Sequence, residues 1–215
     1  MIDLSWEVVL VIDSEGIYRA ANAAVRFSES RNPFQIARDR GIKVCYSGDF
    51  GNLLGMYTCK WKHRIIILNN RLDDYMMKMV CAHELGHDVF HRDLAKDDGI
   101  QEFVLFNMIN HTEYEANAYA AHVLLDDDRV YSLAREGYDV VQMARTMGSN
   151  VNLMLIKMQE MNKLGYDFRI PFDADSTFFK KIQSLFTIGC QCYFIAFLLQ
   201  HCFGKKLIYF IVFYQ

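Results

Sequence analysis

The sequence predicts an α+β fold that is mainly helical and contains a small three-stranded sheet. Three short runs rich in β-branched and aromatic residues lie within residues 42–68, and such runs are typical of strands. Segments with apolar residues at helical spacing stand before and after them. A chain of 215 residues has the size of one domain and can bury about 70% of its unfolded surface. We therefore expect one core, with at most an appendage outside it.

The first predicted elements are two helices and then the strands. Residues 16–27 are predicted to form a helix, and Asn32 and Pro33 supply an N-cap and first-turn pair for a short helix that ends near Gly41. A turn near residues 60–63 joins the last two strands. We expect the three strands at residues 42–46, 53–59 and 64–68.

A longer helix is predicted after the strands. Asp73 or Asp74 can cap its start, where a carboxylate also suits the helix dipole. Residues 73–81 contain no glycine or proline that would interrupt it. One stripe at helical spacing contains, in order, Met76, Val80, His83 and His87.

The segment His83-Glu84-Leu85-Gly86-His87 is typical of a metal site when it lies on a helix. Histidines at i and i+4 lie one turn apart on the same face, so both imidazoles can reach one Zn²⁺. A zinc hydrolase keeps three protein ligands and leaves the fourth position to water, whose proton Glu84 can take. We expect His83 and His87 as ligands, Glu84 as the catalytic base and a third ligand elsewhere. The alternative is a helix that merely carries two histidines on one amphipathic face.

The third ligand is sought on a later helix. A metzincin would have glycine and histidine where this chain has Phe90 and Asp93, so that class is excluded. An irregular stretch is expected over residues 95–110, and a helix follows whose apolar stripe has Glu113 near its centre. Glu115 is turned about 200° from Glu113. The apolar stripe itself contains Ala116, Ala120, Val123 and Leu124.

Glu113 is therefore the better candidate for the third ligand. A carboxylate on a buried stripe costs several kcal/mol unless a charge or a metal compensates it. Glu115 is the alternative ligand, although Thr112 and Glu115 also fit a capping box. Asn110 with Glu113 would form a competing capping box, which would give Glu113 a structural role instead.

These motifs resemble the ImmA/IrrE family of metallo-endopeptidases. The similarity rests on residues 83–87, on residues 113–125 and on a lead-in that includes residues 32–37, 41–44, 55–57 and 65–69, and it extends from about residue 17 to 181. Asp126 stands where relatives often have proline, a difference that concerns the end of the helix.

The resemblance implies a zincin-like fold, with the small sheet beside the motif helix and an edge strand that holds an extended substrate. It also implies that His83, His87 and Glu113 bind zinc and that Glu84 is the general base. The substrate that it implies is a protein, namely a helix-turn-helix transcriptional repressor.

Five further residues near the motifs are candidates for supporting roles. His91 lies one turn beyond His87, and we expect it to support a ligand or to cap the helix. Asn117, one turn after Glu113, can orient a ligand or form a packing hydrogen bond. An oxyanion donor is sought among Tyr114, Tyr119 and His122, although tyrosine in a helix is more often part of the core.

Charge and cysteine usage restrict the partners and the compartment. A net charge of −3 and a pI near 6.2 argue against strong nucleic-acid binding, which needs a concentrated basic face. Residues 139–158 resemble two helices joined by a glycine turn, but Lys157 is the only base of the second, so a packing or partner-docking pair is favoured. Six cysteines without a Cys-x-x-Cys spacing and the absence of a secretory signal predict a reduced, cytoplasmic protein.

The division of the chain is predicted from its composition. Residues 1–181 are expected to form the metallopeptidase domain, with a helical subregion over about residues 127–165. Residues 182–215 form an apolar tail, and residues 182–203 lack charged side chains between pairs of lysines. This length can span a bilayer, but polar residues dilute it. The tail is interpreted as a membrane anchor, a partner-binding extension or an artefact of the reading frame.

Two functions of different classes follow from the sequence. The first is a zinc-dependent endopeptidase that hydrolyses a peptide bond in a repressor. The second is a non-catalytic regulator that binds and sequesters a repressor and keeps zinc for its structure. The substitution Glu84→Gln distinguishes them, because it removes the base and spares the ligands.

Overall fold

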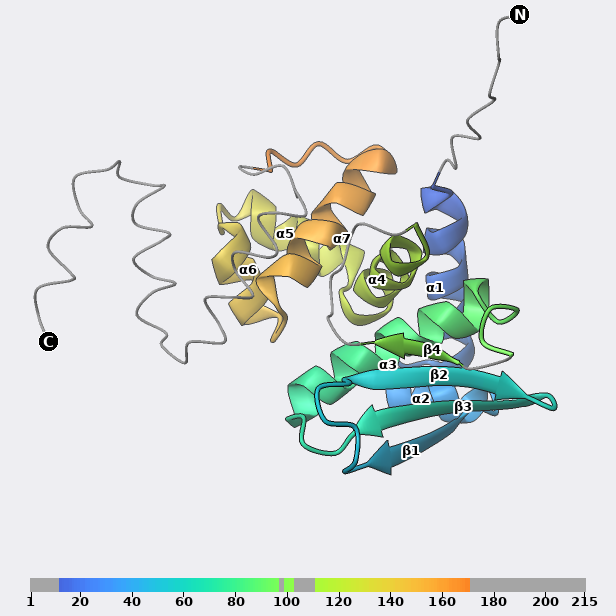
Figure 1. Ribbon diagram of the computed structural model, residues 1–215. Helices are drawn as coiled ribbons and strands as arrows, with labels where there is room; N and C mark the ends of the chain where they lie inside the picture. The colour runs from blue at the N-terminus through green and yellow to red at the C-terminus, as the bar shows by residue number, and fades with distance from the viewer. Residues whose placement is uncertain (1–11, 97–98, 103–110, 171–215) are drawn as a thin grey trace, which may run out of the picture. The chain divides into compact units, whose positions relative to one another are not determined.

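A computed structural model describes residues 12–96, 99–102 and 111–170, all within one compact unit (Figure 1). The predicted boundary near residue 181 and the tail of residues 182–215 lie outside the described residues. The described elements are α1 (Ser14–Ser28), α2 (Pro33–Asp39), β1 (Lys43–Ser47), β2 (Gly55–Lys60), β3 (His63–Asn69), α3 (Asp74–Phe90), β4 (Ile100–Glu102), α4 (His111–Leu124), α5 (Asp127–Arg135), α6 (Val140–Thr146) and α7 (Val151–Lys163).

The predicted fold class is confirmed. Helices make up most of the described chain, and α3 packs against β2 and β3 on one face of the small sheet (Figure 1). Helix α4 packs on α3, and α1 and α7 pack on α4. The metal-site motif therefore lies on a helix between the sheet and the other helices, as the zincin-like interpretation requires.

Within the described residues, the sheet has four strands in the order β1-β3-β2-β4, and not the three that the sequence predicts. β1 pairs parallel to β3, with Lys43 opposite Ile65. β2 pairs antiparallel to β3 and to β4, and Gly55 lies between Leu68 and Glu102. The fourth strand, β4, falls in the stretch that was expected to be irregular. It contains only three residues, too few for an alternating pattern to be recognised.

Two glycines allow the motif helix to approach its neighbours closely. A Cβ atom on Gly86 of α3 would lie 2.7 Å from the Cα of Ala116 in α4. A Cβ atom on Gly55 of β2 would lie 2.5 Å from Val80 Cγ1 and 2.8 Å from Glu84 Oε1. Real Cβ atoms do not come this close to other atoms, so each glycine is required for the contact.

The helical subregion predicted over residues 127–165 corresponds to α5, α6 and α7. Asp126 caps α5 by accepting a hydrogen bond from the Arg129 amide at 3.1 Å. Gly148 (φ +56°) forms the predicted turn between α6 and α7. The side chain of Lys157, the base noted on the second helix of this pair, is fully buried. It therefore offers nothing to a phosphate backbone.

None of the helices within residues 12–96, 99–102 and 111–170 is long and apolar enough to cross a membrane. The predicted span over residues 182–203 lies outside this part of the chain and stays a prediction.

Candidate metal centre

Helix α3 presents the motif in the interior of the protein. Asp73 caps its start by accepting a hydrogen bond from the Met76 amide at 2.7 Å, so the helix is in register well before the motif. The side chains of His83, Glu84 and His87 are at most 1% exposed. Burying three titratable side chains in one helix costs free energy unless hydrogen bonds, an opposite charge or a metal ion compensates them.

Glu113 of α4 meets the two histidines. Its Oε2 lies 3.2 Å from His83 Nε2 and its Oε1 lies 3.6 Å from His87 Nε2, while the two Nε2 atoms are 3.0 Å apart. One potential ligand atom from each residue lies within 4.8 Å of the others. In a tetrahedral zinc site with bonds of 2.0–2.1 Å, neighbouring ligand atoms are about 3.3 Å apart. The spacing of the three groups fits such an ion.

Hydrogen bonds at the far sides of the rings fix the tautomer of each histidine. His83 Nδ1 donates to Asn117 Oδ1 at 2.9 Å, which leaves the lone pair on Nε2. His91 Nε2 donates to Glu115 Oε2 at 2.9 Å, so its Nδ1 accepts from His87 Nδ1 at 3.0 Å. Burial lowers the pKa of His87 and of His91, which favours the neutral form of both rings.

The result is a pocket of electron-pair donors. The lone pairs of His83 Nε2 and His87 Nε2 and the carboxylate of Glu113 face one another across about 3 Å. Two lone pairs at this distance repel each other unless a cation lies between them. Two imidazoles and one carboxylate form a donor set that zinc commonly takes in hydrolases. The residues present therefore fit a zinc ion.

Glu84 completes the group. It follows His83 on α3, and its buried carboxylate lies against the first residue of β2, since Oε1 is 2.8 Å from the position that a Cβ on Gly55 would take. An acid held beside a metal site but outside its ligand set is the arrangement that proton transfer to and from water requires.

Comparison with known proteins agrees with this geometry. Residues 37–159 match the family model described as the IrrE N-terminal-like domain, a peptidase family designated M78. The chain belongs to this family. It is also 30% identical over 122 residues, which are 55% of this chain and 76% of the relative, to "Uncharacterized immunity region protein 2" of Bacillus phage phi105. Family membership indicates a metallopeptidase that acts on proteins, and the matched segment contains the whole His83, His87 and Glu113 cluster.

In this IrrE-like domain, Glu115 lies outside the group of residues that could hold a metal ion. Its Oε2 contacts His91 Nε2 at 2.9 Å and His111 Nδ1 at 3.3 Å. Glu113, and not the alternative Glu115, brings its carboxylate to the two motif histidines. Both carboxylates reach α3, Glu113 at the motif and Glu115 at His91, the residue that caps the C-terminal end of the helix.

The three predicted oxyanion candidates have other neighbours in the IrrE-like domain. The Tyr114 hydroxyl contacts Glu160 and Lys163 of α7. Tyr119 is buried and packs edge-on against Phe90, with ring centroids 6.0 Å apart. His122 Nδ1 contacts Lys157 Nζ at 2.9 Å. These contacts join α4 to α3 and α7.

Asp88 is a buried charge that the sequence analysis did not single out. It is fully enclosed and accepts hydrogen bonds from Tyr57 at 2.7 Å, from Arg64 at 3.1 Å and from Arg92 at 3.2 Å, while Arg40 lies 3.8 Å away. These contacts join α3 to β2, β3 and the end of α2, one residue after the candidate ligand His87. The sequence signal was an acid at a buried position of the helix, next to the motif.

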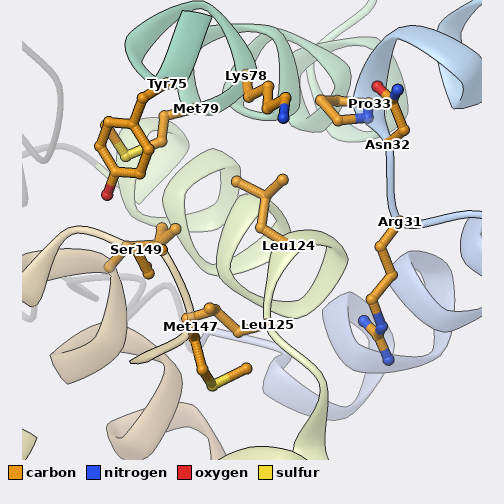
Figure 2. Close-up of a pocket in the computed structure, with 12 residues that line it drawn as sticks. Arg31, Asn32, Pro33, Tyr75, Lys78, Met79, Leu124, Leu125, Met147 and Ser149 are labelled. Carbon is orange, nitrogen blue, oxygen red and sulfur yellow. The ribbon is translucent and has the colours of Figure 1, made fainter. Parts of the chain in front are cut away.

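A pocket of about 300 Å³ lies apart from the metal cluster, and Figure 2 shows its lining. Tyr75, Lys78 and Met79 of α3 form one side. Arg31 also lines it and donates to the carbonyls of His122 and Val123 at the end of α4, at 2.9 and 3.1 Å. None of the metal-cluster residues lines this pocket.

Proposed function

We propose that the protein is a zinc-dependent endopeptidase with His83, His87 and Glu113 as ligands and Glu84 as the catalytic base. The observation that supports this most strongly is the convergence of two Nε2 lone pairs and one carboxylate within 4.8 Å. When bound there, zinc would polarise the scissile carbonyl and make a water molecule more acidic.

Glu84 provides the proton transfers of the reaction. Its carboxylate takes one proton as water adds to the carbonyl carbon and donates it to the amine nitrogen as the peptide C–N bond breaks. The base is thus regenerated in each cycle. Asn117 and His91 keep the lone pairs of the two histidines directed at the ligand position.

The substrate segment is proposed to bind in an extended form along β4. This strand is at the edge of the sheet and pairs with β2 at Gly55, which lies against Glu84. Among the described residues, the other side of β4 has no strand partner. An extended peptide can add to such an edge by main-chain hydrogen bonds and so present a bond to the site.

The protein substrate is proposed to be a helix-turn-helix repressor. The family resemblance implies it, and the name of the phage phi105 relative refers to an immunity region. A cytoplasmic location is part of the same proposal, because such a repressor acts there.

The substitution Glu84→Gln tests the catalytic role. It removes the base while leaving the three ligands, so we expect zinc to stay bound and cleavage of the co-expressed repressor to fall by at least about a hundredfold. Retained zinc shows that the site is intact. If the variant still releases the repressed genes to the same extent, the peptidase hypothesis is wrong. The protein is then better explained as a regulator that sequesters the repressor without cutting it.

A further inference from the structure

The β2–β3 hairpin ends in a strained two-residue turn. Lys60 pairs with His63, and the turn residues Trp61 and Lys62 have φ values of +48° and +67°. Both values lie in the left-handed region, where the asparagine-glycine pair is normally preferred. Two bulky residues held in this conformation destabilise the turn, and retained strain of this kind is a feature of functional sites.

The turn exposes an apolar side chain at one end of the sheet. Trp61 is 91% exposed, the highest value among the large hydrophobic residues described. Leu94, which is 63% exposed, belongs to the same end. It precedes Ala95, whose carbonyl accepts a hydrogen bond from the Cys59 amide at 3.1 Å. The hairpin and the segment after α3 together present two large apolar groups to solvent.

The described residues of the same end carry more basic than acidic side chains. Among them the acidic groups are Asp39, Asp88 and Asp93, of which Asp88 is enclosed by arginines and Asp93 pairs with Lys96. Its cations, placed by strand register and by their contacts with Asp88 and Asp93, are Arg40, Lys43, Lys60, Lys62, Arg64, Arg92 and Lys96.

We propose that this basic end, formed by Trp61, Leu94, Lys43, Lys60 and Lys62, docks on an anionic lipid surface. Tryptophan resides at the level of lipid headgroups, and each lysine near an anionic leaflet adds an attraction that falls with salt. None of the three lysines forms a salt bridge with another described residue, so their charges are available. The docking is weak and reversible, because one or two side chains enter the interface.

The shape and composition of the basic end distinguish this partner from others. Lysine is depleted in protein interfaces, and binding hot spots lie at the centre of a patch ringed by contacts that exclude water. Here the tryptophan stands at the tip of a turn, between Lys60 and Lys62. A lipid surface needs no complementary shape.

Fluorescence of Trp61 in the full-length chain tests the proposal. The chain has two tryptophans, so Trp6→Phe leaves Trp61 as the sole emitter. With phosphatidylcholine vesicles that contain phosphatidylserine, we expect emission at shorter wavelength, reversed by salt, and no change with phosphatidylcholine alone. Vesicle binding that leaves Trp61 emission unchanged overturns the proposal, since the hairpin is then not the contact. A larger shift with a single-stranded oligonucleotide overturns it too.

A charge-reversal pair provides the second arm of the test. Lys60→Glu with Lys62→Glu should weaken vesicle binding at least about 25-fold, because each lysine contributes a factor of about five. The matched control, Arg19→Glu with Arg129→Glu, makes the same change of charge at exposed positions of α1 and α5 and should bind like the parent protein. Equal loss in both pairs would show a dependence on net charge alone and contradict docking by the hairpin.

Discussion

Glu115 Oε2 lies 2.9 Å from His91 Nε2, and this contact determines which nitrogen of His87 faces the metal cluster. The carboxylate holds a proton on His91 Nε2, so His91 Nδ1 accepts from His87 Nδ1 at 3.0 Å. His87 Nε2 is thereby left with its lone pair. Glu115, which lies outside the metal cluster, thus orients the proposed ligand His87 through two hydrogen bonds.

Glu115→Ala should lower zinc affinity by about 10- to 100-fold, the usual effect of losing a group that orients a ligand. Chelator competition with the apoprotein measures it directly. Glu136→Ala, an exposed glutamate whose partner is Ser132, is the control and should leave the affinity unchanged. Equal affinities of the Glu115 variant and the parent protein would show that His87 is oriented by other means.

Asn117→Ala should also weaken zinc binding by about tenfold, because His83 Nδ1 loses the oxygen that fixes its tautomer. Asn117→Asp keeps an acceptor at that place and should restore most of the affinity. Failure of the aspartate variant to bind better than the alanine variant, with both folded by circular dichroism, would contradict an orienting role.

Gly86→Ala should destabilise the protein by about 1–3 kcal/mol or more, because the added Cβ would lie 2.7 Å from the backbone of Ala116. The clash separates α3 from α4, which carry the three proposed ligands. Urea unfolding measures the loss of stability, and zinc affinity should fall with it. Gly86→Ala with unchanged stability would show that the two helices are less tightly packed than described.

Replacing Trp61-Lys62 by Asn-Gly should stabilise the protein by about 1 kcal/mol or more. Both residues have positive φ, which asparagine and glycine adopt at low cost. Thermal unfolding in the absence of lipid measures the gain. A lower unfolding temperature would mean that the original pair contributes contacts that outweigh its backbone strain.

The buried Lys157 predicts a pH dependence of stability. Burial lowers its pKa from 10.5 to about 8, although Asp127 acts in the opposite direction. Above pH 8 the unfolded chain holds a proton that the folded chain has released, so the contribution of Lys157 to stability rises with pH, by about 2 kcal/mol between pH 8 and 9.5.

The comparison with Lys157→Met isolates this effect. Other groups that titrate in this range, such as the thiol of Cys81, whose pKa burial raises, contribute equally to both proteins. The free energy of unfolding of the parent protein, minus that of the variant, should therefore increase between pH 8 and 9.5. Parallel pH curves would show that Lys157 has an ordinary pKa in the folded protein.

Features with a sequence period were predictable, and those that depend on pairing in space were not. The stripe through Met76, Val80, His83 and His87 predicted the motif helix, and the position of Glu113 on the stripe of α4 predicted which glutamate meets it. The strand β4 has three residues and is defined by its pairing with β2. Its existence depends on contacts that no local pattern encodes.

The residues that surround the metal cluster also include one that the sequence predicted and a set of contacts that it did not. His91 was expected to support a ligand, because a histidine one turn beyond His87 lies near the same face. The enclosure of Asp88 by Arg40, Arg64 and Arg92 joins residues from three separate elements. An acid beside the motif signals a buried charge, but its partners are known only once the chain has folded.

The zinc content of three purified proteins tests the metal centre most directly. The parent protein and Glu84→Gln should each bind one zinc ion, whereas Glu113→Ala should bind none at the same free zinc concentration, because its site keeps only two of three ligands. One tightly bound zinc in a folded Glu113→Ala protein would contradict the assignment of Glu113, and absence of zinc from all three would contradict the centre itself.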